Sequence, residues 1–154
     1  MDHLDRNLGF LLHDVARLMR KRFEQNARAL GLTRSQCQVL AHLARHDGIQ
    51  QSSLAEILEV EPITLTRIVD RLEEAGLVER QAHAKDRRIR LLHLTPAARP
   101  LLAEIFAIGA RTRGEAMEGV SEEERDRLFD ILSSMKANLI GKSSTVGERK
   151  ASNG

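Results

Sequence analysis

The chain has 154 residues, a length that fits one domain, and its 42% hydrophobic and 30% charged residues are typical of a soluble, ordered protein. Only 3% of the residues are aromatic, with no Trp or Tyr, so stacking platforms for unpaired bases are nearly absent and binding of single-stranded nucleic acid is disfavoured. The formal net charge of +2 does not by itself indicate a nucleic-acid partner, because only a clustered basic surface releases phosphate counterions effectively.

Cysteine content and hydropathy bear on the compartment. The single cysteine, Cys37, excludes an intramolecular disulfide framework. No apolar run reaches the length of a signal-peptide core or a transmembrane helix. We therefore expect a cytoplasmic protein that makes no membrane contact.

The N-terminal segment has a regular apolar pattern. Residues at alternating spacings of four and three are Leu4, Leu8, Leu11, Val15 and Leu18. This spacing predicts a helix over residues 5–30 that packs lengthwise against another helix, either in a partner subunit or within one chain. Gly31 is suited to its C-terminal cap, and Thr33 with Gln36 forms a capping box that opens a second helix, which ends at Asp47-Gly48.

Two short helices joined by a tight turn are predicted next. Ser53 and Glu56 are suited to cap the first, and Glu61-Pro62 begins the second, with proline in the first turn where its missing N–H costs nothing. One face of the second helix is apolar and predicted to point inward: Leu65, Ile68, Val69 and Leu72. The opposite face is predicted to carry Ile63, Thr64, Arg67 and Arg71.

A basic hairpin follows. Residues 77–81 and 89–94 are predicted to be extended, and the polar stretch 83–88 lies between them. Between Arg80 and Arg90 a single acid, Asp86, stands among five cations: Arg80, Lys85, Arg87, Arg88 and Arg90. This local excess of positive charge favours contact with a polyanion.

The C-terminal part is predicted to be helical. Thr95-Pro96 starts a long helix, and Ser121 with Glu124 forms a second capping box that opens another. The expected fold is mainly α, an α+β winged helix with one domain over residues 1–141. Residues 1–30 and 96–141 would be dimerisation helices, 32–95 the winged helix-turn-helix lobe, and 142–154, which are rich in Ser, Gly and Lys, a disordered tail.

The order of helix, turn, outward-facing helix and basic hairpin is typical of proteins that place one helix in a major groove and a wing in an adjacent minor groove. Arg67 is expected to donate to guanine, Thr64 and Thr66 to bond bases or phosphates, and Ile63 to touch a thymine methyl. Near helix N-termini, Arg34, Ser52 and Ser53 are expected to contact phosphates. The candidate DNA-binding residues are Arg34, Ser52, Ser53, Pro62, Ile63, Thr64, Thr66, Arg67, Arg71, Lys85, Asp86, Arg87 and Arg88.

At the wing, Arg88 is expected to enter a narrow minor groove while Asp86 holds its guanidinium extended. Lys85 and Arg87 are expected to take phosphates. An ordinary surface ion pair between Asp86 and Arg88 is the alternative. Glu61 would repel phosphate if it faced DNA, so we interpret it as a structural residue at the start of the helix.

Several runs of the sequence resemble the MarR family of transcriptional regulators: Leu54-Ala55-Glu56, residues 66–80 (TRIVDRLEEAGLVER), Asp86-Arg87-Arg88 and Leu94-Thr95. Residues 112–115 (TRGE) and 119–121 (GVS) resemble the SlyA branch. The resemblance covers residues 8–140. On the matching positions it makes Arg67 the recognition-helix arginine, and Asp86 and Arg88 the wing's Asp-x-Arg motif.

The resemblance implies a homodimer that binds duplex DNA at a pseudo-palindromic operator, with one recognition helix per half-site. It also implies a pocket for a small aromatic carboxylate or phenolic effector that weakens DNA binding. We therefore expect a ligand-released repressor. The alternative is an architectural DNA binder or silencing antagonist that acts by occupancy, without a dedicated ligand.

The candidate pocket residues are His13, Arg17, Arg20 and Cys37. By the resemblance, Arg17 and Arg20 lie where the SlyA branch has basic residues, and Cys37 replaces the bulky aromatic residue usual there. Packing or surface exposure of these side chains is the alternative, and Cys37 is expected to be buried and inert rather than redox-active. His42 and His46 lie four residues apart without a recognisable third ligand, so no metal and no cofactor are expected. No catalytic motif is found, and we expect no enzyme activity.

Overall fold

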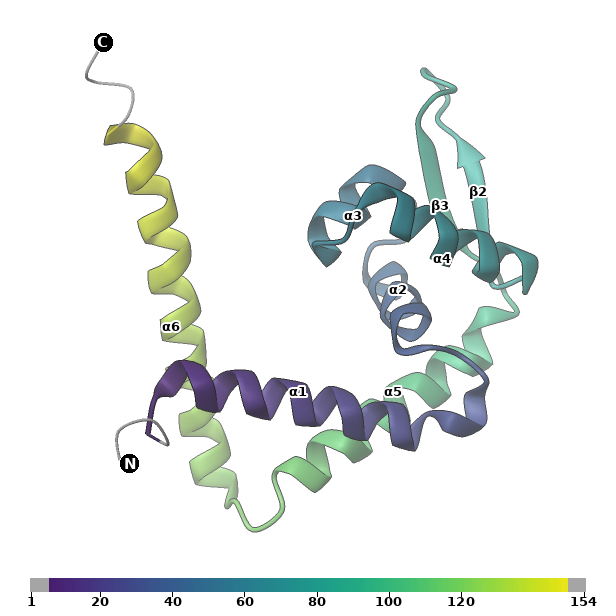
Figure 1. The fold of residues 1–154 in the computed structure, drawn as a ribbon. Coiled ribbons are helices and arrows are strands. Elements are labelled where there is room, and N and C mark those ends of the chain that lie inside the picture. Colours follow the sequence, from purple (N-terminus) through teal and green to yellow (C-terminus); the bar gives the residue numbers. More distant parts are fainter. Residues whose placement is uncertain (1–5, 150–154) are drawn as a thin grey trace. The chain divides into compact units, whose positions relative to one another are not determined.

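A computed structural model of the chain describes residues 6–149, and it describes side chains as far as residue 141. The chain divides into two compact units at Ala116 and Met117. The second unit contains α6 (Glu122–Arg149). The first contains α1 (Leu8–Asn26), the short 3-10 helix η1 (Arg28–Leu30), α2 (Arg34–Arg45), β1 (Ile49–Gln50), α3 (Gln51–Leu58), α4 (Pro62–Glu74), β2 (Val78–Ala82), β3 (Arg90–Leu94) and α5 (Ala98–Ala116) (Figure 1).

Helix α1 is shorter than the predicted helix over residues 5–30. It begins after Asn7, whose side chain accepts from the backbone N–H groups of Gly9 and Phe10, and it ends at the cap residue Ala27, before η1. The cap predicted at Gly31 therefore ends η1 and not α1, and this residue has a φ of 69°, a left-handed conformation that glycine adopts without steric cost.

Both predicted capping boxes are present. At α2, Thr33 Oγ1 accepts from the Gln36 N–H and Gln36 Oε1 accepts from the Thr33 N–H, at 3.2 and 2.9 Å. At α6, Ser121 and Glu124 make the same reciprocal pair at 3.2 and 3.0 Å. Each box satisfies two backbone donors that the first turn of a helix leaves unpaired.

The start of α3 differs from the prediction. Ser53 does not cap this helix, because α3 begins at Gln51 and Gln50 is the cap residue. The reason is that Ile49 and Gln50 form a strand, β1, which the sequence analysis did not predict, and the chain passes directly from that strand into the helix. Pro62 does occupy the first turn of α4, as predicted, with Glu61 at the cap.

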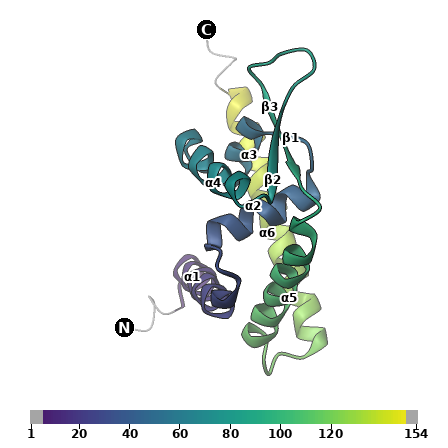
Figure 2. The same cartoon turned by 90° about the vertical axis from the view of Figure 1, so that its right-hand side faces the viewer.

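The sheet is antiparallel and has the order β1-β3-β2 (Figure 2). Strand β2 pairs with β3 from Val78 opposite Leu94 to Ala82 opposite Arg90. The predicted hairpin is therefore confirmed within a residue at each end. Strand β1 adds two pairs on the other side of β3, opposite Leu91 and Leu92.

The hydrophobic core lies among α2, α3, α4, the sheet and the first half of α5. Its fully buried large side chains include Leu40, Leu43, Leu54, Leu65, Val69, Leu72 and Leu92. The inward stripe predicted for α4 is confirmed, with Ile68 half-buried beside its three fully buried residues. Burying each such side chain contributes roughly 1.5–3 kcal/mol, so this core fixes α4 and the sheet relative to each other.

The long helix after Thr95-Pro96 begins at Ala98, slightly later than predicted. It packs against α1 through polar contacts. Arg22 Nη1 lies 2.7 Å from Glu115 Oε2, and Asn26 Nδ2 donates to the buried Thr112 Oγ1 at 3.1 Å. The guanidinium of Arg22 holds the pKa of Glu115 below its ordinary value.

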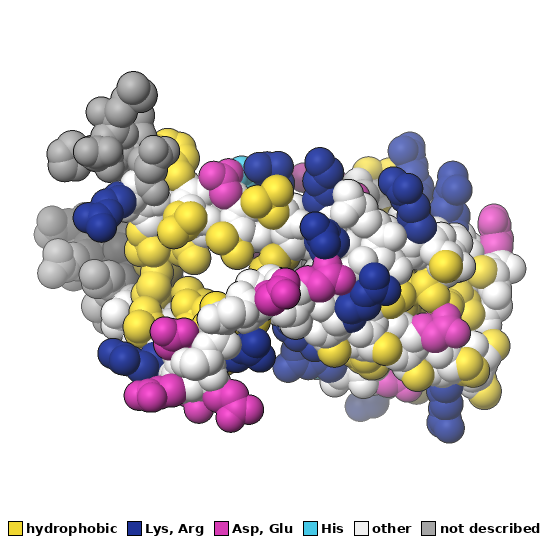
Figure 3. Space-filling view, turned by 90° about the horizontal axis from the view of Figure 1, so that it is seen from below, with side chains coloured by type: hydrophobic (Ala, Val, Ile, Leu, Met, Phe, Trp, Pro, Cys, Tyr) yellow, Lys and Arg dark blue, Asp and Glu magenta, His cyan; other side chains and the backbone are white. Residues whose placement is uncertain are grey.

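Helices α1 and α6 keep their apolar side chains at the surface. Among the residues with described side chains, neither helix contains a buried one. On the face seen in Figure 3, hydrophobic side chains lie open between charged ones. The large exposed ones on the two helices are Leu8, Phe10, Leu11, Leu12, Val15, Leu18, Leu128, Phe129, Ile131, Leu132, Leu139 and Ile140.

Helix α6 continues past Gly141, where the disordered tail was expected to begin, and is helical as far as Arg149. The remainder of that expected tail, residues 150–154, lies outside the described residues. Within the described part of the chain, every helix is too short or too polar to span a bilayer.

Candidate nucleic-acid interface

The outer face of α4 is open to solvent. Ile63 is 60% exposed, and Thr64, Arg67 and Arg71 are exposed beside it. These side chains project opposite the buried stripe, so the core that holds α4 leaves them free to meet a partner. This geometry suits a helix whose exposed side chains contact a binding partner.

Thr66 is the member of the predicted set that is turned away from this face. Its hydroxyl donates to the Pro62 carbonyl oxygen at 3.0 Å and accepts from Gln51 Nε2 at 3.0 Å. Both interactions lie within the protein, so the single hydroxyl proton of Thr66 is already used. The structure therefore places Thr66 between α3 and α4 instead of beside Thr64.

The wing tip between β2 and β3 is basic and exposed. The Arg88 side chain is 91% exposed, and Lys85 and Arg87 are exposed next to it. The Asp86 carboxylate accepts from Arg88 three times, from the backbone N–H at 3.0 Å and from Nε and Nη2 at 3.2 Å each. These bonds lower the pKa of Asp86 and hold the guanidinium extended, as the sequence analysis expected.

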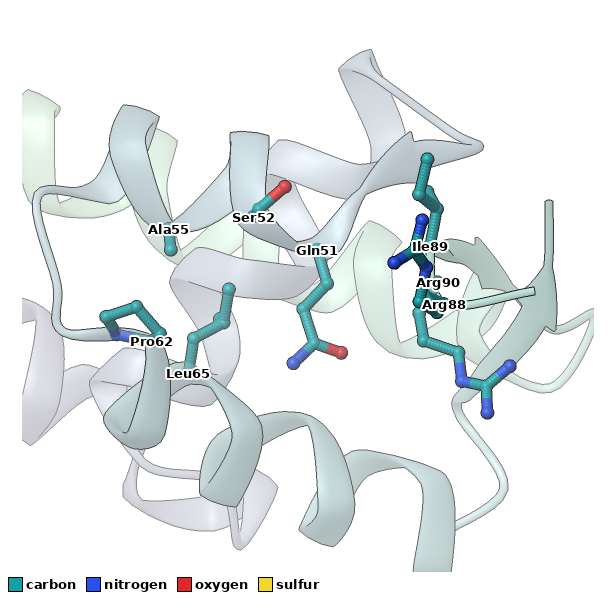
Figure 4. A pocket seen from close by; sticks show the side chains of 8 residues that line it. All are labelled: Gln51, Ser52, Ala55, Pro62, Leu65, Arg88, Ile89 and Arg90. Carbon is teal, nitrogen blue, oxygen red and sulfur yellow. The ribbon is translucent and has the colours of Figure 1, made fainter. Parts of the chain in front are cut away.

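A small notch of about 260 Å³ separates the start of α3 and α4 from the base of the wing (Figure 4). Figure 4 shows Gln51 in the middle, between Pro62 and Leu65 on one side and the wing arginines on the other. The residues around the notch are Gln51, Ser52, Ala55, Pro62, Leu65, Arg88, Ile89 and Arg90. Ser52 is exposed there, whereas Ser53 is half-buried. The notch is thus lined both by α4 and by the wing, so that the two form one surface.

Sequence reasoning missed the most connected side chain of this region, Arg80 on β2. It pairs with Asp70 and Glu73 of α4 and bonds to Gln51 and to the Thr66 carbonyl oxygen. A signal was present in the sequence. Strand residues two apart share a face, so Arg80 lies on the same side as buried Val78 and needs partners there.

A second cavity, of about 450 Å³, opens between α1, α2 and α5. It brings together two of the four predicted ligand-binding residues, Arg20 and Cys37. His13 and Arg17 do not line it; both are exposed on α1, and Arg17 lies 3.8 Å from Asp14. Cys37 is 2% exposed, and burial raises the pKa of its thiol.

The cavity also contains residues that the sequence analysis did not assign to it. Arg34, predicted as a phosphate contact, lines it and pairs with Glu24 at 3.4 Å. Arg113 of α5 lines it as well, and apolar walls come from Met19, Phe23, Ala41, Ile105 and Phe106. Three guanidinium groups around an apolar hollow suit a small anion with a hydrophobic body.

The histidine pair of α2 has a local explanation. His42 Nδ1 lies 2.9 Å from the Gln38 carbonyl oxygen one turn earlier, and His46 is exposed at the end of the helix. Over the described residues, no three His, Cys, Asp or Glu side chains come close enough together to hold a metal ion.

Comparison with known proteins agrees with this geometry. Residues 32–89 match the model of the MarR family. The transcriptional regulator PA3341 is 40% identical, with 88% of this chain and 99% of that one covered and a TM-score of 0.77. The transcriptional regulator SlyA is 27% identical over 91% and 99% of the two chains, with a TM-score of 0.77.

A cysteine-to-serine mutant of MarR from E. coli, solved in complex with operator DNA, is also similar. It is 26% identical, with 83% of this chain and 92% of that one covered and a TM-score of 0.73. The family match spans α2 to the wing, and the similarity to whole solved chains extends over most of the chain. This chain therefore belongs to the MarR family of winged-helix transcriptional regulators.

Proposed function

We propose that this protein is a cytoplasmic, dimeric regulator that binds duplex DNA at a pseudo-palindromic operator and represses transcription until a small anionic ligand releases it. The observation that carries the proposal is the continuous surface of α4, notch and wing, with exposed Arg67 at one end and exposed Arg88 at the other. The E. coli relative that is similar over this region was solved on operator DNA.

On this surface, α4 enters the major groove. Arg67 donates to a guanine edge, and Ile63 and Thr64 contact neighbouring bases. Thr66 and Arg71 are assigned differently. Thr66 supports the helix from behind because its hydroxyl is bonded inside the protein, and Arg71, one turn after Arg67, takes a phosphate.

The wing reaches the adjacent minor groove. Arg88 enters it in the extended pose that Asp86 imposes, and Lys85 and Arg87 neutralise phosphates on either side. Ser52, at the rim of the notch, donates to the phosphate that lies between the two grooves. Pro62 forms the apolar wall next to it.

Two copies of the chain are needed for this arrangement. The apolar side chains that α1 and α6 leave exposed form seams at helical spacing, and a second copy is the occupant that buries them. A two-fold symmetric dimer then carries two recognition helices to two half-sites, which is the reason for proposing a pseudo-palindromic operator.

The ligand site is the cavity between α1, α2 and α5. Its arginines, Arg20, Arg34 and Arg113, bind the carboxylate of a small aromatic acid, and its apolar walls take the ring. Gly109 helps to present Arg113, since a Cβ at this position would lie 3.2 Å from Arg113 Nη1. A coupling of about 1–3 kcal/mol between ligand and DNA sites suffices for release.

We assign the protein to the SlyA branch on the basis of residues 112–115 and 119–121. Two residues of the first run also have a structural role. Thr112 and Glu115, two residues of the first run, form the polar contact with Asn26 and Arg22 of α1. The run therefore contributes to the packing of α5 against α1.

Fluorescence anisotropy across a salt series tests the DNA assignment. The duplexes are genomic fragments from beside the protein's own gene, and the proteins are wild type, Arg67→Ala, Arg88→Ala and the control Arg45→Ala, which alters an exposed arginine at the end of α2. Wild type and the control are expected to bind one fragment tightly. Arg67→Ala loses the preference, and Arg88→Ala weakens binding. Equal binding by all four proteins, or by none, contradicts the proposal.

Benzoate titration into the protein–DNA complex tests the ligand site. Benzoate is expected to release wild type, and Arg113→Gln to require a higher concentration for the same release, while its operator affinity without benzoate is unchanged. If Arg113→Gln and wild type respond alike, the cavity is not the site. If benzoate releases neither protein from DNA although both bind the operator tightly, a regulator that acts by occupancy is favoured.

A further inference from the structure

We infer that Arg80 is a positioning residue: it sets the recognition helix α4 relative to the wing and thereby determines how sharply the protein distinguishes its operator from other DNA. The inference rests on the proposed function, because it concerns the same DNA-binding surface. Arg80 lies on β2, a strand of the wing, and its side chain is only 17% exposed.

Two carboxylates of α4 hold the guanidinium. Arg80 Nη1 lies 2.6 Å from Asp70 Oδ1 and 3.2 Å from Glu73 Oε1. The second carboxylate oxygen of Glu73 accepts from the Arg80 backbone N–H at 3.1 Å. Side chain and main chain of the strand are thus both bonded to the C-terminal half of the recognition helix.

The same guanidinium also reaches the N-terminal half of α4. Its Nη2 donates directly to the Thr66 carbonyl oxygen at 3.2 Å. Its Nε donates to Gln51 Oε1 at 3.0 Å, Gln51 Nε2 donates to Thr66 Oγ1 at 3.0 Å, and Thr66 Oγ1 donates to the Pro62 carbonyl oxygen at 3.0 Å. This series of hydrogen bonds runs from Arg80 to Pro62 in the first turn of α4, next to Ile63 and Thr64.

These contacts fix the orientation of α4 relative to the wing as well as the distance between them. Arg80 holds α4 from its first turn to Glu73 and holds α3 through Gln51, which lies in the notch between helix and wing. The planar guanidinium imposes directions on its hydrogen bonds that a flexible ammonium group does not. A small rotation of α4 would move Arg67 relative to the major groove while the wing stayed in place.

Arg80 is not itself a DNA contact in this arrangement. Its Nε, Nη1 and Nη2 all donate to protein atoms, and two carboxylates lie against it. Removing it should therefore leave the number of neutralised phosphates unchanged. This separates it from Arg88, whose loss should reduce the dependence of binding on salt concentration.

The test uses the full-length protein and the operator that wild type selects from a random duplex library, with a shuffled duplex of the same length and composition as the non-specific competitor. The variants are Arg80→Lys, Gln51→Met and Arg45→Lys, the last being a matched arginine-to-lysine control at an exposed position. The readouts are the ratio of the two dissociation constants, the slope of log K against log salt, and thermal unfolding.

Arg80→Lys and Gln51→Met are each expected to lower the ratio by roughly tenfold, the effect of losing about one base contact, with the salt slope unchanged. Arg45→Lys keeps the wild-type ratio. If Arg80→Lys is too unstable to measure, Gln51→Met decides, since it removes the link through α3 without removing a charge. A wild-type ratio in the decisive variant, with or without a lower melting temperature, overturns the inference. If wild type selects no sequence at all, the proposed function fails instead.

Discussion

The winged-helix lobe and the helices α1 and α6 differ in how far their leucine side chains are buried. In the lobe, most leucines of α2, α3, α4 and β3 are fully buried within one chain, namely Leu40, Leu43, Leu54, Leu65, Leu72 and Leu92. On α1 and α6, residues with the same hydropathy and an equally regular spacing stay exposed. The lobe therefore buries its own apolar side chains, whereas the described residues leave those of α1 and α6 exposed, for the second copy proposed above to cover.

The largest expected effect comes from the lobe. Leu72→Ala should lower the free energy of unfolding by about 2–5 kcal/mol, because it leaves a cavity beneath α4 where the leucine is fully buried. Urea unfolding followed by circular dichroism measures the change. Ile63→Ala, on the exposed face of the same helix, is the control and should change stability by less than about 0.5 kcal/mol. Equal losses of stability in Leu72→Ala and Ile63→Ala would contradict the difference between the buried and exposed faces of α4.

A charge on α1 tests the other region. Leu18 is 52% exposed in the single chain, so Leu18→Asp should cost little within one copy. If the seam is buried in a dimer, the same change should raise the dimer dissociation constant by at least about 30-fold, the factor that 2 kcal/mol corresponds to. Sedimentation velocity over a dilution series measures it. Arg17→Asp, on the same helix but outside the apolar seam, is the control.

The apolar patterns explain why so much of the lobe was predictable. The inward stripe of α4, both capping boxes and the hairpin depend on residues within a few positions of one another. Strand β1 was missed because two residues give no alternation, and its existence depends on pairing with Leu91 and Leu92, far along the chain. The misplaced start of α3 has the same origin.

Polar contacts between distant elements were the least predictable part of the site. Gln51, Thr66 and Arg80 are far apart in sequence, and neither the residue types nor their spacing indicates that they share one hydrogen-bond chain. Thr66 was assigned to the groove because it is polar and next to Arg67, but a helical residue beside an outward one can still face a neighbouring helix. Arg20 and Cys37 line the same cavity, whereas His13 and Arg17 do not, since a position along α1 does not fix which side of the helix faces the cavity.

A smaller effect concerns the polar contact between α1 and α5. Glu115→Gln should lower the melting temperature slightly at pH 7, since Arg22 loses its charged partner and exposed ion pairs contribute little. The pKa of Glu115 is lowered in the folded state, so its contribution is present above the unfolded-state pKa and is lost as the pH falls through the folded-state value.

The difference between wild type and Glu115→Gln should accordingly shrink below a pH of about 4.3, the ordinary value for glutamate. Calorimetry at several pH values measures this trend. Glu104→Gln on the same helix is the control, because the described residues provide Glu104 with no ion pair. A difference that grows as the pH falls would contradict the assigned contact.

The smallest effect is at the exposed wing tip. The Asp86 carboxyl should titrate below its ordinary pKa of about 3.9, because Arg88 donates to the charged form. Side-chain carbon-13 NMR of wild type and Arg88→Ala measures the two midpoints, and the variant should titrate at higher pH. Coincident midpoints would mean that the hydrogen-bonded pair of Asp86 and Arg88 does not persist in solution.

The hydrogen-bonded pair of Asp86 and Arg88 also has a thermodynamic consequence. An unrestrained arginine side chain carries about 2 kcal/mol of rotamer entropy, which is lost when its guanidinium is held in a groove. The bonds from Arg88 Nε and Nη2 to Asp86 already order the side chain in the free protein. Part of the ordering cost is therefore met during folding, so the proposed insertion of Arg88 into a minor groove would lose less entropy than insertion of an unrestrained surface arginine.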